Sequence, residues 1–297
     1  MTVLVIGANG LVGSALVQTC LDRRREVIGT YHTTRPDFEI ELFELDLRDD
    51  DRIREIVEEV APDAVVNCAA YTDVDDCERN PELAHAVNTE GPRLLAETCA
   101  ERGVAFVHLS TDYIFDGEAD KPYTEDDEPN PLQVYGETKL AGERFVLEAA
   151  PEALVCRLSF VWGRHGATGE LEGFPAWVLG RARDGDSVPL FTDQKVTPTR
   201  AGDVAEVVLD LLAREAEGVF HVASRDCVTP YEFGTAVLEE AQPSATGLLE
   251  KSSLEDVERA APRPADTCLS TRRVAKKLDR DRATVETGVA TVFLTES

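Results

Sequence analysis

The sequence predicts an α/β protein in which a doubly wound parallel sheet carries a second, smaller lobe. Short apolar runs of strand length alternate with amphipathic stretches over roughly the first half of the chain, which indicates crossover connections between parallel strands. The first apolar run leads directly into a glycine-rich turn, "VIGANGLVG". After about residue 160 the alternation weakens while glycine and charged residues increase, which indicates a second lobe.

The expected strands lack polar alternation, as is typical of strands buried on both faces of a parallel sheet. They cover residues 2–7, 26–31, 43–45, 63–69, 104–110 and 153–159. Helical stretches at 11–25, 50–60, 81–102 and 135–149 lie between most of them and suit right-handed crossovers. This order of elements is typical of the Rossmann fold.

The chain is expected to return to this sheet once, because residues 199–214 read as a helix and 218–224 as a strand. We therefore expect a main domain at 1–162, completed by about 200–224. The smaller lobe would comprise 163–199 and 225–297, with a helix near 230–241 and two weaker helices after it.

Composition excludes several classes of partner. The 297 residues carry a net charge of -27, so we expect neither nucleic acid nor anionic membrane to bind. An excess of acidic residues of this size also suggests a salt-rich cytoplasm, where ions screen the repulsion between carboxylates. Seven dispersed cysteines without a metal-ligand spacing predict free thiols, no disulfide scaffold and no metal site. With no signal peptide and no apolar run approaching roughly 20 residues, a cytoplasmic protein is expected.

The glycine-rich turn predicts a dinucleotide site. Gly7, Gly10 and Gly13 follow the first strand and open the first helix, although their spacing differs from the commoner G-x-G-x-x-G. Glycines there allow a tight turn, close approach of a pyrophosphate to the helix amides, and packing of helix on strand. The backbone amides of Asn9, Leu11 and Val12 are the expected phosphate contacts.

The end of the second strand favours NADP over NAD. NAD-selective sites place an acid there to hold the ribose 2′-hydroxyl, whereas this chain reads "TYHTTRP". Arg35, with His32 or Thr33, could meet a 2′-phosphate. Arg35 as a loop cation without a ligand, and NAD as the cofactor, remain the alternatives.

Three polar residues form a candidate catalytic set. Tyr135 and Lys139 fall on the same face of a helix, four residues apart. A free phenol titrates near pH ~10, and a neighbouring ammonium lowers that pKa, so Lys139 is expected to make Tyr135 a usable acid. The same lysine can hold the nicotinamide ribose, so Tyr135 and Lys139 are also expected beside the cofactor. Thr111, at the carboxyl end of the fifth strand, can donate a hydrogen bond to a substrate carbonyl.

Together these motifs resemble the extended short-chain dehydrogenase/reductase superfamily, and within it the dTDP-4-dehydrorhamnose reductases. The likeness also runs through "VVNCAAYTDVDDCERNPELAHAVNTEG", "LSTDYIFDG", "PNPLQVYGETKLAGE", "RLSFVWG", "FTDQKVTPTRAGDVA" and "PRPADTCLST". It implies an NAD(P)-binding main domain and a substrate-binding smaller lobe. The catalytic residues implied are Thr111, Tyr135 and Lys139. Beside the cofactor it implies, in addition to the glycine turn, Tyr31, His32, Arg35, Asp46, Leu47, Cys68, Ala69, Ala70 and Tyr71. On the substrate side it implies Ser110, Thr111, Asp112, Tyr113, Phe160 and Trp162.

The sequence departs from the family pattern on the substrate side. Phe160 stands where tryptophan is common, Gly173-Phe174 replaces Asn-Phe, and Val196 replaces a frequent glycine. Dehydratase relatives carry Thr-Asp-Glu where this chain has Thr111-Asp112-Tyr113, which disfavours elimination.

These observations lead to three alternative functions. The leading one is NADPH-dependent reduction of the 4-keto group of a nucleotide-activated 6-deoxy sugar. One alternative is an NAD-dependent sugar-nucleotide epimerase. The other is a non-catalytic, NADP-binding regulatory subunit, since this branch also resembles the cofactor-binding partner of methionine adenosyltransferase. The sequence leaves open the sugar, the nucleotide and whether the chain forms a homodimer.

Overall fold

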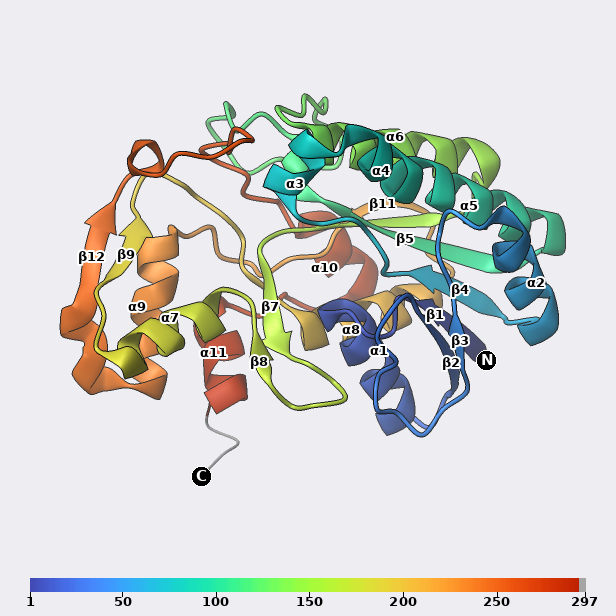
Figure 1. Ribbon diagram of the computed structural model, residues 1–297, viewed down its shortest axis with the longest axis horizontal. Helices are drawn as coiled ribbons and strands as arrows, with labels where there is room; N and C mark the ends of the chain where they lie inside the picture. The colour runs from blue at the N-terminus through green and yellow to red at the C-terminus, as the bar shows by residue number, and fades with distance from the viewer. Residues whose placement is uncertain (294–297) are drawn as a thin grey trace.

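A computed structural model, which describes residues 1–293, contains a central parallel sheet of seven strands in the order β11-β6-β5-β4-β1-β2-β3 (Figure 1). The strands are β1 Thr2–Ile6, β2 Glu26–Tyr31, β3 Leu42–Glu44, β4 Ala64–Asn67, β5 Ala105–Thr111, β6 Leu154–Leu158 and β11 Gly218–His221. This confirms the predicted doubly wound α/β fold. The order in which strands are added to the sheet reverses between β1 and β4. Ligands of such sheets bind at the carboxyl ends of the strands beside this switch in strand order.

Helices cover both faces of this sheet (Figure 1). On one face lie α1 Leu11–Asp22 and α8 Ala201–Leu212, whose apolar residues join those of the strands in one buried cluster. On the other face lie α2 Asp50–Val60, α5 Gly91–Arg102 and α6 Val134–Ala149. The apolar stripes predicted from the sequence therefore face the sheet, because burial of those stripes drives the packing.

The stretch predicted as one helix at 81–102 is interrupted. It consists of α4 Pro81–His85, a π-helical turn at Ala86–Glu90 and α5, preceded by α3 Val74–Arg79. Pro92 has no amide hydrogen to donate to the carbonyl of Asn88, four residues earlier, so the regular bonding pattern cannot continue there. The amide side chain of Asn88 accepts from the Tyr71 amide at 2.8 Å and donates to the Tyr71 carbonyl at 3.0 Å. The turn thereby fixes the segment that follows β4.

The second lobe lies beside the carboxyl ends of the strands (Figure 1). Its strands are β7 Val161–Arg164, β8 Leu171–Glu172 and β10 Thr199–Arg200 in one sheet, and β9 Val188–Phe191 and β12 Leu249–Ser252 in another. Its helices are α7 Phe174–Asp184, α9 Pro230–Ala241 and α11 Val285–Phe293. Short 3₁₀ helices occur at Asp112–Ile114, Pro243–Leu248 and Leu254–Asp256.

One helix of the predicted smaller lobe belongs with the main sheet instead. In α10, Arg272–Leu278, Val274 and Leu278 are buried in the same apolar cluster as α1 and α8. The predicted boundary at residue 225 is therefore wrong for this helix. The physical reason is that α10 buries its apolar side chains against β11 and α8 rather than against the smaller lobe. Residues 294–297 of that prediction lie outside the described residues.

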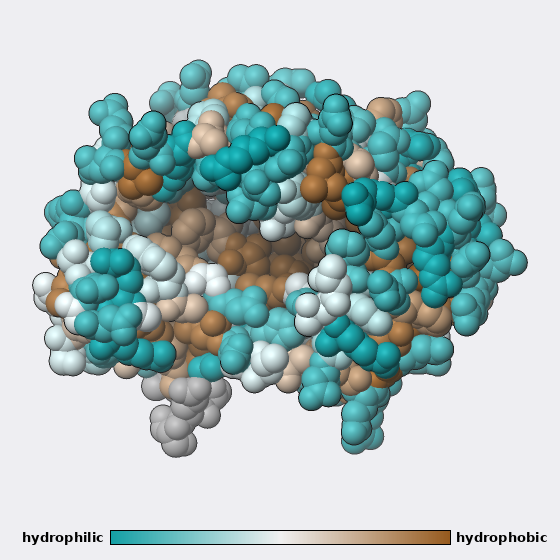
Figure 2. Space-filling model, in the orientation of Figure 1, coloured by the Kyte–Doolittle hydropathy of each residue, from teal (hydrophilic) through white to brown (hydrophobic). Residues whose placement is uncertain are grey.

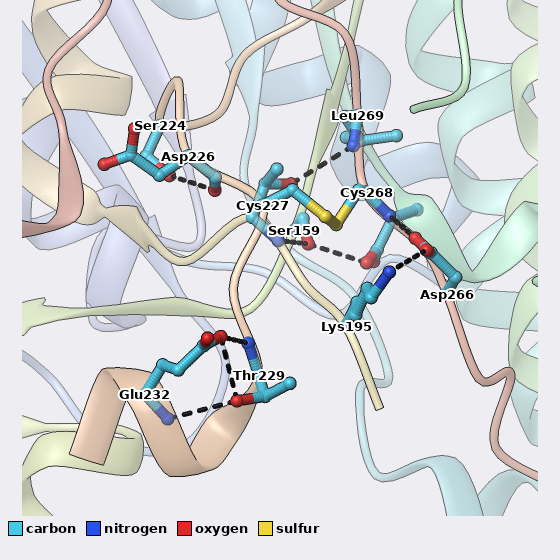
Figure 3. Close-up of a disulfide and its surroundings, with 12 residues drawn as sticks. Ser159, Lys195, Ser224, Asp226, Cys227, Thr229, Glu232, Asp266, Cys268 and Leu269 are labelled. Atoms are coloured by element: carbon cyan, nitrogen blue, oxygen red, sulfur yellow. Dashed lines mark hydrogen bonds and ion pairs between the residues drawn. A yellow bond between two sulfur atoms is a disulfide. The ribbon is translucent and has the colours of Figure 1, made fainter. Parts of the chain in front are cut away.

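A disulfide joins Cys227 to Cys268, with the two Cα atoms 5.5 Å apart (Figure 3). The expectation that all seven cysteines are free is wrong for this pair. The two residues are separated by 41 positions in the chain, so their proximity depends on the fold and no spacing motif marks it. Cys20, Cys68, Cys77, Cys99 and Cys156 are free.

No helix among residues 1–293 combines the length and the apolar character that crossing a bilayer requires.

Candidate active site

A cleft of about 690 Å³ opens between the main sheet and the second lobe. Figure 2 shows it as an apolar hollow in an otherwise hydrophilic surface. Segments far apart in the chain meet here, because the carboxyl ends of the strands share one edge of the sheet. The predicted residues that line it are Gly7, Asn9, Gly10, Leu11, Val12, Tyr31, His32, Cys68, Ala69, Ala70, Ser110, Thr111, Asp112, Tyr113, Tyr135, Lys139 and Phe160.

The glycine turn forms one end of the cleft. Gly7 has a φ of 82°, a conformation that favours glycine. Gly13 does not line the cleft. A Cβ atom on Gly13 would lie 2.1 Å from the Gly7 carbonyl oxygen, so only glycine lets α1 pack this close to the turn. The first amides of α1 have no partner within the helix and point toward the cleft entrance, as a phosphate site requires. These residues fit the pyrophosphate of a dinucleotide.

Beyond β2, the cleft is lined by His32, Thr33 and Thr34, whereas Arg35 is exposed and lies outside the lining. Arg35 directly follows Thr34, which lines the cleft, and its contact with a 2′-phosphate stays a prediction. Asp46 also lies outside the lining, but its carboxylate is 3.5 Å from His32 Nε2. A hydrogen bond from Arg48 lowers the pKa of Asp46 to about 2, so this carboxylate is an anion at neutral pH.

Two other predicted cofactor residues support the cleft from behind. Leu47 is buried in the core and packs closely on Gly91, where a Cβ atom would lie 2.9 Å from the Leu47 Cβ. Tyr71 donates its hydroxyl to Asp76, and its backbone is held by Asn88. Ala70 and Thr72 line the cleft in its place.

The three candidate catalytic side chains meet at the centre of the cleft. Thr111 comes from the end of β5, and Tyr135 and Lys139 come from the first turns of α6. A hydrogen bond from Thr111 lowers the pKa of Tyr135, but burial is the larger effect and raises it above that of a free phenol. Tyr135 is therefore a neutral phenol at physiological pH, with a proton to donate.

Burial, and not the charge of Lys139, has the largest effect on the pKa of Tyr135, contrary to expectation. The ammonium nitrogen of Lys139 lies 2.6 Å from the Leu109 carbonyl oxygen and 3.4 Å from His108 Nε2. Burial lowers the pKa of Lys139 to about 8. Desolvation thus outweighs the charge effect that sequence spacing suggests, because both side chains lie on a buried face of α6.

Asp112 connects the catalytic strand to the second lobe. Its carboxylate accepts hydrogen bonds from Ser159 at 2.7 Å and Thr111 at 3.2 Å. Burial raises the pKa of Asp112 to about 6, while the nearby hydroxyls of Thr267 and Ser159 oppose that change. Thr267 directly precedes the disulfide-bonded Cys268, so the disulfide holds the segment that contacts this carboxylate.

A second cavity of about 430 Å³ adjoins the first and shares Tyr113 and Phe160 with it. Phe160 adopts a φ of 45°, a strained conformation for a bulky residue, at the junction of the two. Apolar and aromatic residues form most of the wall. Its further lining residues are Phe174, Trp177, Pro189, Leu190, Phe191, Gln194, Pro230, Ser252, Val257, Arg259 and Arg263.

Sequence reasoning missed the two arginines of this cavity. The Arg259 guanidinium lies 4.9 Å from the centre of the Phe191 ring, and Arg263 pairs with Asp75 at 2.9 Å. Burial and the neighbouring Arg263 lower the pKa of Arg259, which indicates two cations facing each other. The sequence feature that could have indicated them is "ERAAPRPAD", where two arginines stand four residues apart in an otherwise acidic chain.

Trp162 does not reach either cavity, and its prediction as a substrate residue is wrong. The side chain is 1% exposed and packs against Phe233 in the core of the second lobe. Side chains alternate between the two faces of a strand. Val161, the first residue of β7, lines the cleft, so the indole of Trp162, the next residue, points into the core.

One group of potential metal-ligating side chains, Cys227, Asp266 and Cys268, occurs among the described residues. Both sulfur atoms are in the disulfide, so neither is a thiolate that could bind a cation. Lys195 lies 3.7 Å from Asp266 beside them (Figure 3).

Comparison with known proteins agrees with this geometry. A Haloferax volcanii protein named "Probable low-salt glycan biosynthesis reductase Agl14" is 48% identical over 98% of this chain and 96% of its own length. The dTDP-4-dehydrorhamnose reductase of Mycolicibacterium smegmatis is 34% identical over 92% of this chain and 79% of its own. The Bacillus anthracis dTDP-4-dehydrorhamnose reductase, solved in complex with NADP, has a TM-score of 0.86 at 25% identity and covers 100% of this chain and 99% of its own. Residues 1–296 match the RmlD substrate binding domain, and the chain belongs to this family.

Proposed function

We propose that this protein is an NADPH-dependent reductase of the 4-keto group of a nucleotide-activated 6-deoxy sugar. The observation that carries the proposal is the junction of two cavities at Tyr113 and Phe160, beside Thr111 and Tyr135 in the first cavity. One cavity begins at a dinucleotide-type glycine turn, and the other contains two arginines. Relatives named as dTDP-4-dehydrorhamnose reductases support the same reaction.

Tyr135 would supply the proton in this reaction. Bound NADPH supplies the hydride. Tyr135 is protonated at neutral pH, and its hydroxyl faces the cleft beside the Thr111 hydroxyl. Thr111 orients the substrate oxygen, while Tyr135 donates the proton as negative charge develops on it. Lys139, once protonated, stabilises the resulting phenolate.

The second cavity suits the nucleotide part of the substrate. Arg259 and Arg263 lie close enough for their charges to repel, and Asp75, which pairs with Arg263, offsets part of this repulsion. A diphosphate would relieve their mutual repulsion through charge-assisted hydrogen bonds. Phe174, Trp177 and Phe191 offer aromatic faces on which a base could stack.

Two features support NADP as the preferred cofactor. The end of β2 presents His32, Thr33 and Thr34 to the cleft, while the nearby Asp46 carboxylate lies outside the lining and pairs with Arg48. The Bacillus anthracis relative binds NADP.

The test is a turnover screen of dTDP- and UDP-linked 4-keto-6-deoxy sugars with NADPH and NADH. We expect NADPH oxidation in the wild type and little in Tyr135→Phe. Tight NADPH binding without turnover of any sugar would overturn the proposal in favour of a regulatory subunit. Retention of NAD through purification, with sugar interconversion but no net NADPH consumption, would instead identify an epimerase.

A further inference from the structure

His108 is a buried histidine that contacts Lys139 and has no role in the reaction described above. It lies on β5, three residues before Thr111, and its side chain is completely buried. Its Nδ1 atom is 3.3 Å from Asn67 Nδ2, and its Nε2 atom is 3.4 Å from Lys139 Nζ. The imidazole therefore connects the end of β4 to the lysine on α6.

The hydrogen-bond partners of Asn67 determine which nitrogen of His108 carries the proton. Asn67 Oδ1 accepts from the Ala69 amide at 3.1 Å, so the NH₂ group of Asn67 is the part that faces His108. An NH₂ group can only donate, which makes Nδ1 the acceptor. In a neutral imidazole the proton then lies on Nε2. Burial and the charge of Lys139 lower the pKa of His108 well below that of a free histidine, so the ring is neutral.

The Nε2–H group points at Lys139 Nζ, and it can donate there only if the amine is neutral and has a free lone pair. An ammonium at the same place would set a donor against a donor. A protonated Lys139 keeps the Leu109 carbonyl as an acceptor but is repelled by the imidazole N–H. The contact with His108 thus favours the amine over the ammonium, while the bond to the Leu109 carbonyl is open to both forms.

We propose that His108 is a positioning residue for Lys139: its Nε2–H group donates to the neutral amine beside β5 and so opposes protonation of this lysine. The inference rests on the ketone reduction proposed above, in which the ammonium is the active form. It adds His108 as a group that sets the pH range in which Lys139 is protonated.

Other ionisable groups near Lys139 do not account for this control. Glu143, on the same helix, pairs with Arg157 at 2.8 Å and favours the ammonium. Cys68 follows β4, and burial raises its pKa to about 12, so it is a neutral thiol at neutral pH. Tyr135 is neutral, and Asp112 acts on Tyr135. His108 is the neighbour whose N–H group opposes protonation directly.

The first test measures the tautomer in the wild-type protein by ¹⁵N NMR of labelled histidine, over roughly pH 6 to 9. Absence of one signal in His108→Gln assigns His108 among the five histidines. We expect the Nε2–H tautomer throughout this range. An Nδ1–H tautomer, or an imidazolium, would overturn the proposal whether or not the protein reduces any sugar. This measurement also decides the case if His108→Gln does not fold.

The second test is the pH dependence of kcat/KM for His108→Gln. A glutamine offers an acceptor oxygen near the former Nε2 position, so the ammonium of Lys139 gains a partner and its pKa rises from about 8. We expect the alkaline fall in activity to move upward by about one pH unit, which is about tenfold more activity at a fixed alkaline pH. His221→Gln is the matched control, because His221 is equally buried but packs on Phe115. An unmoved alkaline limb in folded His108→Gln, or the same movement in the control, would overturn the proposal.

Discussion

At the scale of single residues, burial decides the chemistry of this site more than charge does. The pKa of Tyr135 is raised and that of Lys139 is lowered to about 8, and desolvation is the largest cause for both. Both changes favour the neutral form, so the resting site holds a phenol and a lysine near its titration point. Protonation of Lys139 below about pH 8 then supplies the positive charge that the developing phenolate needs.

The first prediction at this scale concerns Tyr135→Phe. The change removes the proton donor and keeps the ring, so we expect turnover to fall by about 10²–10⁴ while NADPH affinity changes little. Lys139→Met should lower both, because it removes the ammonium and a contact predicted for the nicotinamide ribose. Steady-state NADPH oxidation and cofactor titration measure the two effects. Retention of more than half of wild-type turnover in Tyr135→Phe, with chemistry limiting, would contradict the assigned role.

At the scale of elements, the cofactor end depends on how closely α1 packs against the turn that precedes it. Ser14 donates its amide to the Gly10 carbonyl at 2.7 Å, and the Gly10 amide bonds to Gly7 at 3.1 Å. His165, in the second lobe, lies 3.0 Å from the Asn9 carbonyl through Nε2. The turn is thereby held from both lobes, and its amides are fixed before a phosphate arrives.

A pair of glycine substitutions tests this packing. In Gly13→Ala, the new Cβ would lie 2.1 Å from the Gly7 carbonyl oxygen, so α1 or the turn must move. We expect a loss of about 1–3 kcal/mol in the free energy of unfolding, with weaker NADPH binding. Gly10→Ala is the control, because its φ is -79° and the nearest contact is 3.5 Å. Urea unfolding and cofactor titration measure both. If both changes had equal effects, close packing of α1 would not be the reason that position 13 needs glycine.

At the scale of the whole molecule, two features act on stability far from the reaction. The disulfide between Cys227 and Cys268 joins a loop after β11 to the segment that contacts Asp112. The surface is largely hydrophilic, and 57 acidic residues outnumber 30 basic ones (Figure 2). The disulfide restricts the unfolded chain, while the surface charge opposes compactness.

Reduction of the disulfide should lower the free energy of unfolding. Closing a loop of 41 residues removes conformational entropy from the unfolded chain, worth about 4 kcal/mol at 25 °C. The measurement is urea unfolding with and without reductant. Cys227→Ser should resemble the reduced wild type and should not respond to reductant. A wild type that unfolds at the same urea concentration in both conditions would show that the bond contributes nothing to stability.

Salt should stabilise the folded protein. With a net charge of -27, repulsion between exposed carboxylates falls as the screening length shortens to about 3 Å in molar salt. We expect the thermal midpoint to rise from dilute buffer to molar potassium chloride. The control is the double variant Arg157→Met/Glu143→Leu. The side chains of this ion pair are only 6% and 3% exposed, so salt does not screen it and the thermal midpoint of the variant should depend on salt as the wild type does. A midpoint that is flat or falls with salt would contradict adaptation to high ionic strength.

Much of the fold and part of the site follow from local sequence. Buried strands and amphipathic helices have periodic patterns, so the central sheet and its crossovers are predictable. The glycine turn and the spacing of Tyr135 and Lys139 are equally local. Arg259 and Arg263 were not predicted, since their role depends on a cavity whose wall comes mostly from residues more than sixty positions away. Trp162 was misplaced because the sequence gives its position along the chain and not the direction of its side chain.

The sequence by itself determined the order of strands and helices, the cofactor turn and the three candidate catalytic residues, because each depends on neighbours within a few positions. Tertiary structure alone decided the pairing of Cys227 with Cys268, the packing of α10 on the main sheet and the protonation of the site. Sequence spacing predicted that Lys139 would lower the pKa of Tyr135, whereas burial raises it. The physical reason is that desolvation depends on every element packed around a group, and those elements come from all parts of the chain.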